Sequence, residues 1–179
     1  MFDVIKTSLA GVMVLKPVVR GDPRGRFVKT FHAGFFEEQG LRTDFVESYY
    51  SVSAKGVLRG MHFQLPPAQH AKLVYCCSGR IHDCVVDLRR DSASFGRHFD
   101  IELDADASTM LYIPEGCAHG FLSLTEDAMT VYNVTSVYDP ASDSGILWSS
   151  FGFAWPHAAP LLSERDRTFV PLAEFKSPF

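Results

Sequence analysis

Short apolar runs alternate with polar residues along most of the chain, and Gly, Pro, Asp and Ser separate them. From Gly56 onward these runs recur every eight to twelve residues or so, a spacing typical of an all-β sandwich or barrel. The expected strands are Gly11–Val18, Phe27–Phe31, Phe45–Val52, Val57–Phe63, Lys72–Cys77, Arg80–Leu88, His98–Leu103, Thr109–Ile113, His119–Ser123 and Met129–Val134. A double-sheet jelly roll fits this pattern best, and its sheets enclose a cavity lined by every second side chain.

Helical signals are few. The polar and aromatic run Gly34–Leu41 predicts one short helix, and Ser163–Arg167 predicts a helical turn in an otherwise irregular, Pro-rich tail. Ser78-Gly79 predicts a hairpin turn between two strands. Because the chain shows no repeat or flexible linker, we expect residues 1–179 to form a single domain.

Composition argues against nucleic-acid binding, membrane insertion and secretion. The 17 basic and 21 acidic residues give a net charge of −4, and no basic block is present that could follow a phosphate backbone, so nucleic acid is not an expected partner. No apolar stretch is long enough to span a membrane, and Asp3 and Lys6 interrupt the N-terminus where a signal peptide would be apolar. A soluble, cytoplasmic protein is therefore expected. The cysteines form no C-x-x-C pair and are expected to be reduced packing residues.

Polar residues interrupt the apolar strand expected at Val57–Phe63. Arg59 and His62 stand three positions apart in it, and taken alone they fit a core histidine and a surface arginine as well as they fit a site. Strict alternation would place them on opposite faces of the strand. A shared site therefore requires a local irregularity, for which Gly60 is the candidate.

Two segments resemble the sequence motifs of cupins. The spacing Pro-x-Gly-x-x-His that ends at His119 resembles the second motif, and Gly56 to His62 resembles the start of the first. Metal-binding cupins continue the first motif with a second histidine and a glutamate, where this chain has Gln64, Ala68 and Gln69. Two histidines are too few ligands for a divalent metal, so neither a metal nor another cofactor is expected.

Several ordered segments together resemble the dTDP-4-dehydrorhamnose 3,5-epimerase family. They are Gly21–Gly25, Val57–Gln64, Lys72–Val74, Asp83–Arg89, Ile113–Phe121, Tyr132, Ile146–Pro156 and Leu162–Asp166. The resemblance covers nearly the whole chain. It implies a metal-independent, cupin-type isomerase of deoxysugar or surface-polysaccharide biosynthesis. Such an enzyme inverts carbons next to the C4 ketone of a nucleotide-linked 4-keto-6-deoxyhexose. The resemblance also implies a homodimer, in which N-terminal strands complete the neighbour's site.

The same resemblance implies catalytic roles for particular residues. His62 matches the general base, Asp166 the acid that orients it, and Tyr132 the proton donor. Lys72 matches the cation that stabilises the enolate, and Asp83 matches an acid that could hold this lysine. Without the resemblance, Asp166 would be interpreted as an exposed tail residue, Lys72 as an edge-strand lysine and Tyr132 as a packed ring.

Further positions are expected to contact substrate. Arg24, Arg59 and His119 resemble family contacts, and the two arginines suit pyrophosphate oxygens. Glu47, Tyr49, Lys29, Gln64, Asp83 and Arg165 complete the expected substrate-binding set. The dTDP enzymes usually carry glutamate where Lys29 stands, Gln-Asp-Asn where Glu47-Ser48-Tyr49 stands, and lysine where Arg165 stands. These departures leave a GDP- or CDP-linked sugar open beside a dTDP-linked one.

Three other functions remain as alternatives. A cupin ketoisomerase would move the carbonyl between C3 and C4 with a similar base, and a metal-dependent cupin would need ligands that this chain lacks. A non-catalytic sugar-binding cupin would not require His62, Lys72, Tyr132 and Asp166 together. Within the epimerase interpretation, inversion at one carbon or at two also stays open.

Overall fold

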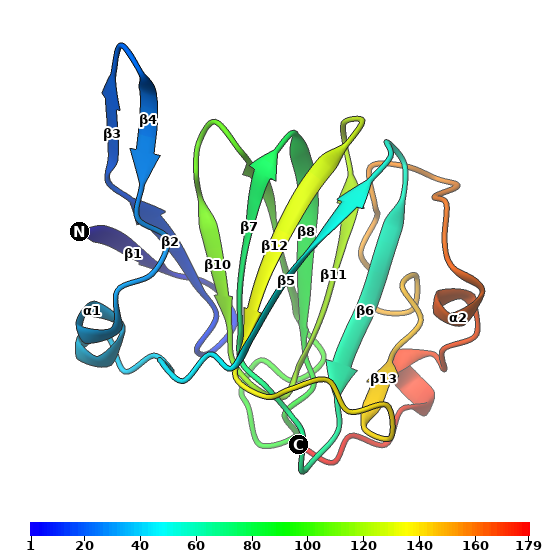
Figure 1. Ribbon diagram of the computed structural model, residues 1–179. Helices are drawn as coiled ribbons and strands as arrows, with labels where there is room; N and C mark the ends of the chain where they lie inside the picture. The colour runs from blue at the N-terminus through cyan, green and yellow to red at the C-terminus, as the bar shows by residue number, and fades with distance from the viewer.

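The computed structural model describes residues 1–179 as two antiparallel β-sheets packed face to face, with a two-stranded ribbon projecting from one side (Figure 1). The larger sheet has the order β1-β2-β10-β7-β12-β5, with β1 (Phe2–Lys6), β2 (Met13–Pro17), β10 (Met110–Ile113), β7 (Lys72–Ser78), β12 (Ala128–Val134) and β5 (Glu47–Ser53). The smaller sheet has the order β13-β6-β11-β8-β9, with β13 (Asp143–Gly145), β6 (Leu58–Gln64), β11 (Cys117–Ser123), β8 (Arg80–Asp87) and β9 (His98–Asp104). The predicted double-sheet, all-β architecture is confirmed.

The remaining elements are short. The projecting ribbon pairs β3 (Val19–Asp22) with β4 (Gly25–Val28). The helices are α1 (Ala33–Glu38), α2 (Glu164–Arg167) and a 3-10 turn at Leu172–Glu174. None of the helices is long and apolar enough to cross a lipid bilayer.

Nine of the ten expected strands agree with the structure to within about two residues at each end. The exception is Phe27–Phe31, because the strand there is β4 and ends at Val28. The predicted hairpin at Ser78-Gly79 is confirmed, since Gly79 adopts a φ of 71° between β7 and β8. Both helical predictions are also confirmed. Three strands, β1, β3 and β13, were not predicted.

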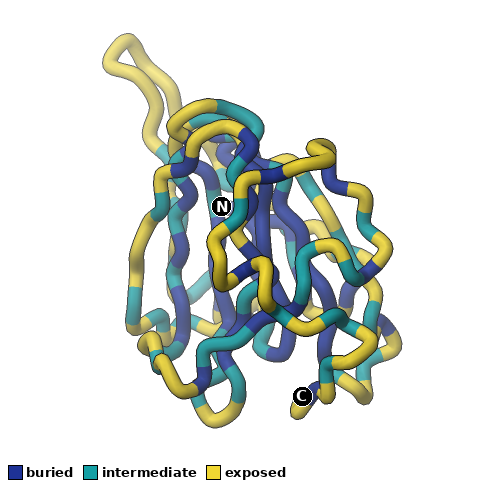
Figure 2. The backbone as a smooth tube through the Cα atoms, turned by 90° about the vertical axis from the view of Figure 1, so that its right-hand side faces the viewer, coloured by how far each residue is buried: buried dark blue, intermediate teal, exposed yellow.

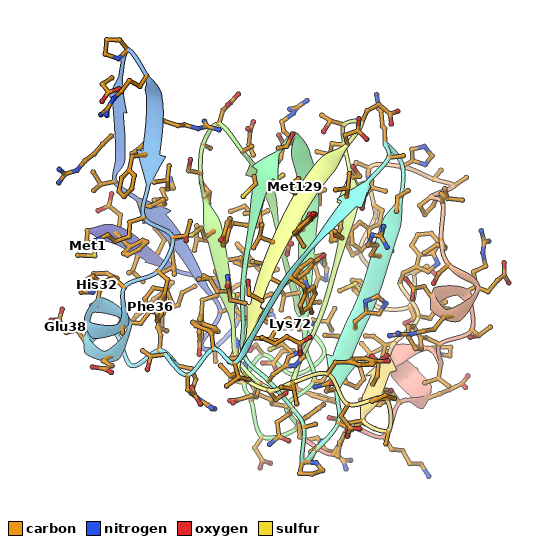
Figure 3. All side chains as sticks on the ribbon, viewed as in Figure 1. Met1, His32, Phe36, Glu38, Lys72 and Met129 are labelled. Carbon is orange, nitrogen blue, oxygen red and sulfur yellow. The ribbon has the colours of Figure 1, made fainter.

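Apolar side chains pack in three layers. One cluster lies between the sheets and includes Val74, Val85 and Phe121. A second lies outside the smaller sheet, where Trp155 and other residues of the C-terminal segment cover it. A third covers the larger sheet near its β1 edge, around Phe36, which turns toward the sheet while Glu38 points away (Figure 3). Figure 2 shows the buried strands in the centre and the mostly exposed ribbon beyond them.

Strand alternation brings one charged residue into the interior. On β7, Leu73 packs in the outer cluster, while Val74 and Cys76 join the cluster between the sheets. Lys72 shares their face, as alternation predicts, and is only 6% exposed (Figure 3). A buried ammonium needs polar partners, so the end of the sandwich near Lys72 is where a polar cavity is expected.

Candidate active site

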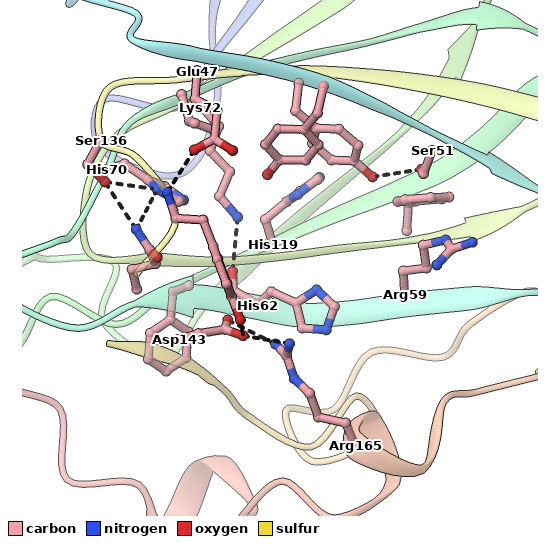
Figure 4. Close-up of a pocket in the computed structure, with 17 residues that line it drawn as sticks. Glu47, Ser51, Arg59, His62, His70, Lys72, His119, Ser136, Asp143 and Arg165 are labelled. Carbon is pink, nitrogen blue, oxygen red and sulfur yellow. Dashed lines mark hydrogen bonds and ion pairs between the residues drawn. The ribbon is translucent and has the colours of Figure 1, made fainter. Parts of the chain in front are cut away.

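A cavity of about 380 Å3 opens between the two sheets at this end of the sandwich (Figure 4). It brings together side chains from β5, β6, β7, β11 and β12 and from α2. The residues predicted from the sequence that line it are Glu47, Tyr49, Arg59, His62, Gln64, Lys72, His119, Tyr132 and Arg165. The cavity is therefore the candidate active site.

His62 forms a dyad with Asp166 on the smaller-sheet wall of the cavity. The His62 Nε2 atom lies 2.8 Å from Oδ1 of Asp166, and the two side chains are 31% and 4% exposed. Burial lowers the pKa of His62, although the contact with Asp166 acts to raise it. Burial acts to raise the pKa of Asp166, but the hydrogen bond with His62 and other donors hold it below its ordinary value. An ionised Asp166 accepts from Nε2–H, which leaves Nδ1 with the free lone pair.

The capping of α2 and the backbone of β6 hold Asp166 in place. Ser163 is the N-cap of α2, and its hydroxyl accepts from the backbone N–H of Asp166 at 3.1 Å. The second carboxylate oxygen of Asp166 accepts from the backbone N–H of Gly60 at 3.2 Å. A residue from the C-terminal tail is therefore fixed against the strand that carries the histidine.

The predicted irregularity at Gly60 is confirmed. In the pairing of β6 with β11, His119 faces His62 and Phe121 faces Arg59, so Gly120 alone lies opposite both Gly60 and Met61. This bulge places Arg59 and His62 on the same cavity. Gly60 adopts a φ of 145°, and a Cβ atom there would lie 2.5 Å from the Cα of Gly120. Only glycine fits this close approach of two strands.

Tyr132 lies on the opposite wall, on β12 of the larger sheet, and is 8% exposed. Its hydroxyl lies 3.4 Å from Oγ of Ser51, and its ring stacks on that of Tyr49 with centroids 4.9 Å apart. Burial raises the pKa of Tyr132 far above its ordinary value, so the phenol stays protonated at neutral pH. Figure 4 shows Ser51 across the cavity from His62.

Lys72 lies between these two walls, and its ammonium donates to the backbone carbonyl of His62 at 3.2 Å. Burial lowers its pKa to about 8, while the charges of Asp83 and Asp143 act in the opposite direction. Asp83, which matches an acid that could hold Lys72, forms no ion pair with it. Asp83 instead accepts from Nε2 of His119 at 2.8 Å, and both of these side chains are buried. Asp83 thus lies behind His119 and acts on Lys72 only through its charge.

The cavity thus presents an imidazole and a protonated phenol from opposite sheets, with a buried ammonium between them. An imidazole with a free lone pair can remove a proton from carbon, and a protonated phenol can supply one. A buried ammonium can stabilise the negative oxygen that forms between these two steps. This arrangement suits inversion at a carbon next to a carbonyl.

Comparison with known proteins agrees with this chemistry. The family model described as dTDP-4-dehydrorhamnose 3,5-epimerase matches residues 6–174. The chain belongs to this family. A dTDP-4-dehydrorhamnose 3,5-epimerase of Shigella flexneri is 43% identical over 167 residues, which cover 92% of each chain.

Solved structures of family members have the same fold. The dTDP-4-dehydrorhamnose 3,5-epimerase of Bacillus anthracis, with TDP and pyrophosphate bound, superposes with a TM-score of 0.93 at 36% identity, covering 96% of this chain and 100% of that one. A 3′-monoepimerase of Streptomyces bikiniensis in complex with dTDP-quinovose gives a TM-score of 0.88 at 36% identity, covering 93% and 86%. The cupin-type jelly roll expected from the sequence is thereby confirmed, and the similar proteins are named as 3,5-epimerases and as a 3′-monoepimerase.

Gln64 lines the cavity and also forms hydrogen bonds to the loops that contain Ala68 and Asp139. Its amide nitrogen donates to the carbonyl of Ala68 at 2.8 Å, and its amide oxygen accepts from the N–H of Asp139 at 2.7 Å. The residue stands where metal-binding cupins have a second histidine. No three His, Cys, Asp or Glu side chains in the molecule are grouped so that they could hold a metal ion.

Three expected substrate contacts lie outside the cavity: the buried Asp83, described above, and two residues of the N-terminal region. Arg24 stands at the tip of the β3–β4 ribbon, where it pairs with Asp22 at 2.5 Å and its side chain is 90% exposed. Lys29 follows β4 and is also exposed. Neither residue lines the cavity of its own chain, because the ribbon projects away from the sandwich (Figures 1 and 2).

Sequence reasoning missed Tyr138 and Asp143, which line the mouth of the cavity. Both terminal nitrogens of Arg165 donate to the carboxylate of Asp143, at 2.6 and 3.0 Å. The hydroxyl of Tyr138 donates to the same carboxylate at 3.3 Å. Glu47 accepts from the backbone N–H of Tyr138 at 2.7 Å. Asp143 lies in β13, a strand of three residues whose sequence, Asp-Ser-Gly, resembles a turn, so only the pairing with β6 could have revealed it.

Proposed function

We propose that this protein epimerises a dTDP-linked 4-keto-6-deoxyhexose at carbons next to the C4 ketone. The observation that carries the proposal is that His62 and Tyr132 reach one cavity from opposite sheets. Inversion requires a proton to leave one face of the sugar ring and another to arrive at the other face. Two groups on opposite walls meet that requirement without any movement of the sheets.

In the first step, Nδ1 of His62 takes the proton from the carbon. The electron pair of the broken C–H bond forms an enolate, with the negative charge on the C4 oxygen. Asp166 keeps the imidazole in the tautomer that can accept, and stabilises the imidazolium that results. Because the pKa of His62 is lowered, the base is already unprotonated at neutral pH.

Lys72 is proposed to stabilise the enolate oxygen, with the buried His119–Asp83 pair beside it. A charge inside a dry cavity acts far more strongly on a developing anion than it would in water. Its pKa of about 8 keeps Lys72 mostly charged at neutral pH.

In the second step, Tyr132 gives its hydroxyl proton to the carbon from the other face, and the enolate electrons form the new C–H bond. The tyrosinate then regains a proton from solvent, and the His62 imidazolium releases one, so protons and electrons balance. Every step uses a side chain of the protein.

Arg59 is proposed to bind the pyrophosphate. Its guanidinium lines the cavity, and hydrogen bonds to the Ser53 hydroxyl and the Val52 carbonyl fix its orientation there.

A homodimer is proposed to complete this site. Val18, Val19 and Phe27 on and beside the β3–β4 ribbon are exposed, and an isolated two-stranded ribbon has little stability of its own. A second copy would cover the ribbon, and the ribbon would bring Arg24 to the partner's pyrophosphate. Sedimentation equilibrium should give the mass of two chains, and a monomer at micromolar concentration would contradict this part of the proposal.

Residues 1–179 are proposed to act as one catalytic domain, since β1 and α2, from the two ends of the chain, both attach to the same sandwich.

The dTDP moiety is proposed because the relatives named above are enzymes of dTDP sugars. In addition, Lys29, one of the positions expected to differ from the dTDP enzymes, lies outside the cavity. Titration of the protein with dTDP, GDP and CDP tests this choice, and tightest binding of GDP or CDP would contradict it.

The reaction is tested by incubating the protein with a dTDP-linked 4-keto-6-deoxyhexose in heavy water. Deuterium should enter carbons next to the ketone, with inversion and without migration of the carbonyl. His62→Ala should abolish deuterium entry while dTDP binding persists. Tyr132→Phe should still allow entry, because the histidine can return a deuteron to its own face, but inversion should be lost. Carbonyl migration would favour a ketoisomerase, and absence of any exchange would favour a sugar-binding protein.

A further inference from the structure

The two tyrosines of the cavity form a stacked pair. Tyr49 on β5 stands directly opposite Tyr132 on β12 in the antiparallel pairing. Their rings lie 4.9 Å apart and are inclined by only 20°. Directly paired residues of neighbouring strands are the closest side-chain neighbours in a sheet, so the two backbones impose the stack.

Other groups restrict Tyr132 on its remaining sides. The ring of His119 packs edge-on against it, with centroids 6.1 Å apart and planes at 71°. The hydroxyl of Ser51 lies 3.4 Å from the Tyr132 hydroxyl. With a ring on one face, a ring edge on another and a hydroxyl at its tip, Tyr132 has little freedom to swing.

This restriction matters because a 4-keto sugar has two acidic carbons, C3 and C5, on either side of the ketone. A phenol that reaches both must shift its oxygen, or the sugar ring must turn between the two steps. A phenol held in one orientation delivers its proton to one carbon in preference to the other. The angle of the Tyr132 ring is thus a property on which the product depends.

Tyr49 supplies the second ring of this arrangement, and it stands in the run Glu47-Ser48-Tyr49 at the start of β5. An asparagine at this position would have no ring to stack on Tyr132. The family also contains enzymes named as 3,5-epimerases and one named as a 3′-monoepimerase, so the number of inverted carbons varies within it.

We propose that Tyr49 is a positioning residue that holds the Tyr132 hydroxyl over one carbon, so that this protein inverts one of the two carbons next to the ketone much faster than the other. The inference rests on the proposed function, because it assumes that Tyr132 is the proton donor. Tyr49 acts through Tyr132 and needs no contact with the reacting atoms.

The test compares wild type with Tyr49→Asn, Tyr49→Ala and Tyr49→Phe on a dTDP-linked 4-keto-6-deoxyhexose in heavy water. NMR spectroscopy measures the initial rates of inversion with deuterium at C3 and at C5. In wild type one rate should exceed the other at least tenfold. Tyr49→Phe keeps the ring and should keep this ratio, whereas Tyr49→Asn and Tyr49→Ala should reduce it at least fivefold. Thermal unfolding of all four proteins identifies any variant that does not fold. Because the asparagine and alanine variants both remove the Tyr49 ring, either one alone is enough for the test if the other does not fold.

Two outcomes would overturn the inference. Equal rates at both carbons in wild type would show that the stack does not restrict the donor. An unchanged ratio in the asparagine and alanine variants, with only the total rate or the melting temperature lowered, would show that Tyr49 serves packing alone. If wild type instead exchanges at neither carbon, the proposed function itself fails, and that result differs from both of the others.

Discussion

The imidazole of His62 is under two opposing influences, and their balance decides how it works. Burial disfavours the imidazolium, while the carboxylate of Asp166 favours it, and burial prevails because the pKa is lowered. Asp166 therefore offsets only part of the loss of basicity that burial imposes on His62. Its hydrogen bond fixes which nitrogen carries the proton and holds the ring toward the cavity.

Asp166→Asn tests this role. The amide can donate to Nε2 as readily as it can accept, so it allows the tautomer in which Nδ1 is protonated and cannot act as a base. We expect the rate of deuterium exchange to fall by about 10²- to 10⁴-fold, with dTDP affinity changed little. Exchange rates followed by NMR and binding followed by calorimetry measure the two effects. A fall of less than threefold would mean that the carboxylate is not needed for the tautomer.

The buried ammonium of Lys72 predicts an alkaline limit of activity. The enolate is stabilised by the charged form only, so kcat/KM should fall as pH rises through about 8, where Lys72 loses its proton. On the acid side, kcat/KM should rise with pH through the lowered pKa of His62, below its ordinary value. The profile should be a bell with its plateau near neutral pH.

Lys72→Arg provides the matched control for this profile. A guanidinium stays charged at every pH at which the protein is folded, so the alkaline fall should disappear even if the maximum rate is lower. The acid side of the profile should not move. An alkaline limb that stays near pH 8 in Lys72→Arg would assign it to another group.

At the residue scale, the motif resemblance, and not the strand pattern, assigned roles to His62, Lys72 and Tyr132 and named Asp166 as the partner of His62. On the pattern alone, a core histidine, an edge-strand lysine and a packed tyrosine ring remain open. The pairing of Asp83 with His119 instead of Lys72 depends on which strands are neighbours, and that is set by register across the sheet. Asp143 comes from a strand too short and polar to be recognised without the coordinates.

At the scale of the element, the bulge in β6 is the feature that makes the site. Gly60→Ala should place a Cβ atom 2.5 Å from Gly120 and force an alanine into a φ of 145°. We expect the free energy of unfolding to fall by about 4 kcal/mol, since clash and backbone strain add. Urea denaturation followed by circular dichroism measures this change.

Gly96→Ala separates the effect of the steric clash from the effect of backbone strain. Gly96 also has a positive φ, of 73°, but no atom lies within 4 Å of an added Cβ. Strain alone should lower the free energy of unfolding by about 1 kcal/mol there. If the two variants were equally destabilised, the close approach of β6 and β11 would not be a tight constraint.

Alternation predicts a strand when one of its faces is buried, and this explains which strands could be found. Most of the predicted strands carry residues of the cluster between the sheets or of the cluster outside the smaller sheet, and their ends agree closely with the structure. By contrast, all four residues of β3 are exposed, so no apolar face marks that strand. The bulge at Gly60 could be anticipated only because Arg59 and His62 were expected in one site, whereas strict alternation would place them on opposite faces of the strand.

At the scale of the whole molecule, the projecting ribbon allows a test of shared sites. If Arg24 serves the cavity of a partner, Arg24→Ala and His62→Ala damage different sites of a mixed dimer. Each variant alone should be at least tenfold less active than wild type. After unfolding and refolding together, about half of the chains should enter mixed dimers with one intact site each, and activity should return to about a quarter of the wild-type value.

No recovery in the mixture, with dimer mass confirmed by sedimentation, would mean that Arg24 does not act across the dimer. The mixture of Arg24→Ala with wild type is the matched control, because its activity follows from the number of intact sites alone. Recovery in the first mixture, combined with this control, would assign the ribbon to the neighbour's cavity.

The position of Asp166 has a consequence for the life of the protein in the cell. All strands of the sandwich lie before Ile146, whereas the carboxylate that orients the base arrives with α2, near the end of the chain. During translation the barrel can thus close around its cavity before the tail leaves the ribosome. A chain that stops before α2 would have the walls of the cavity without the carboxylate that orients its base.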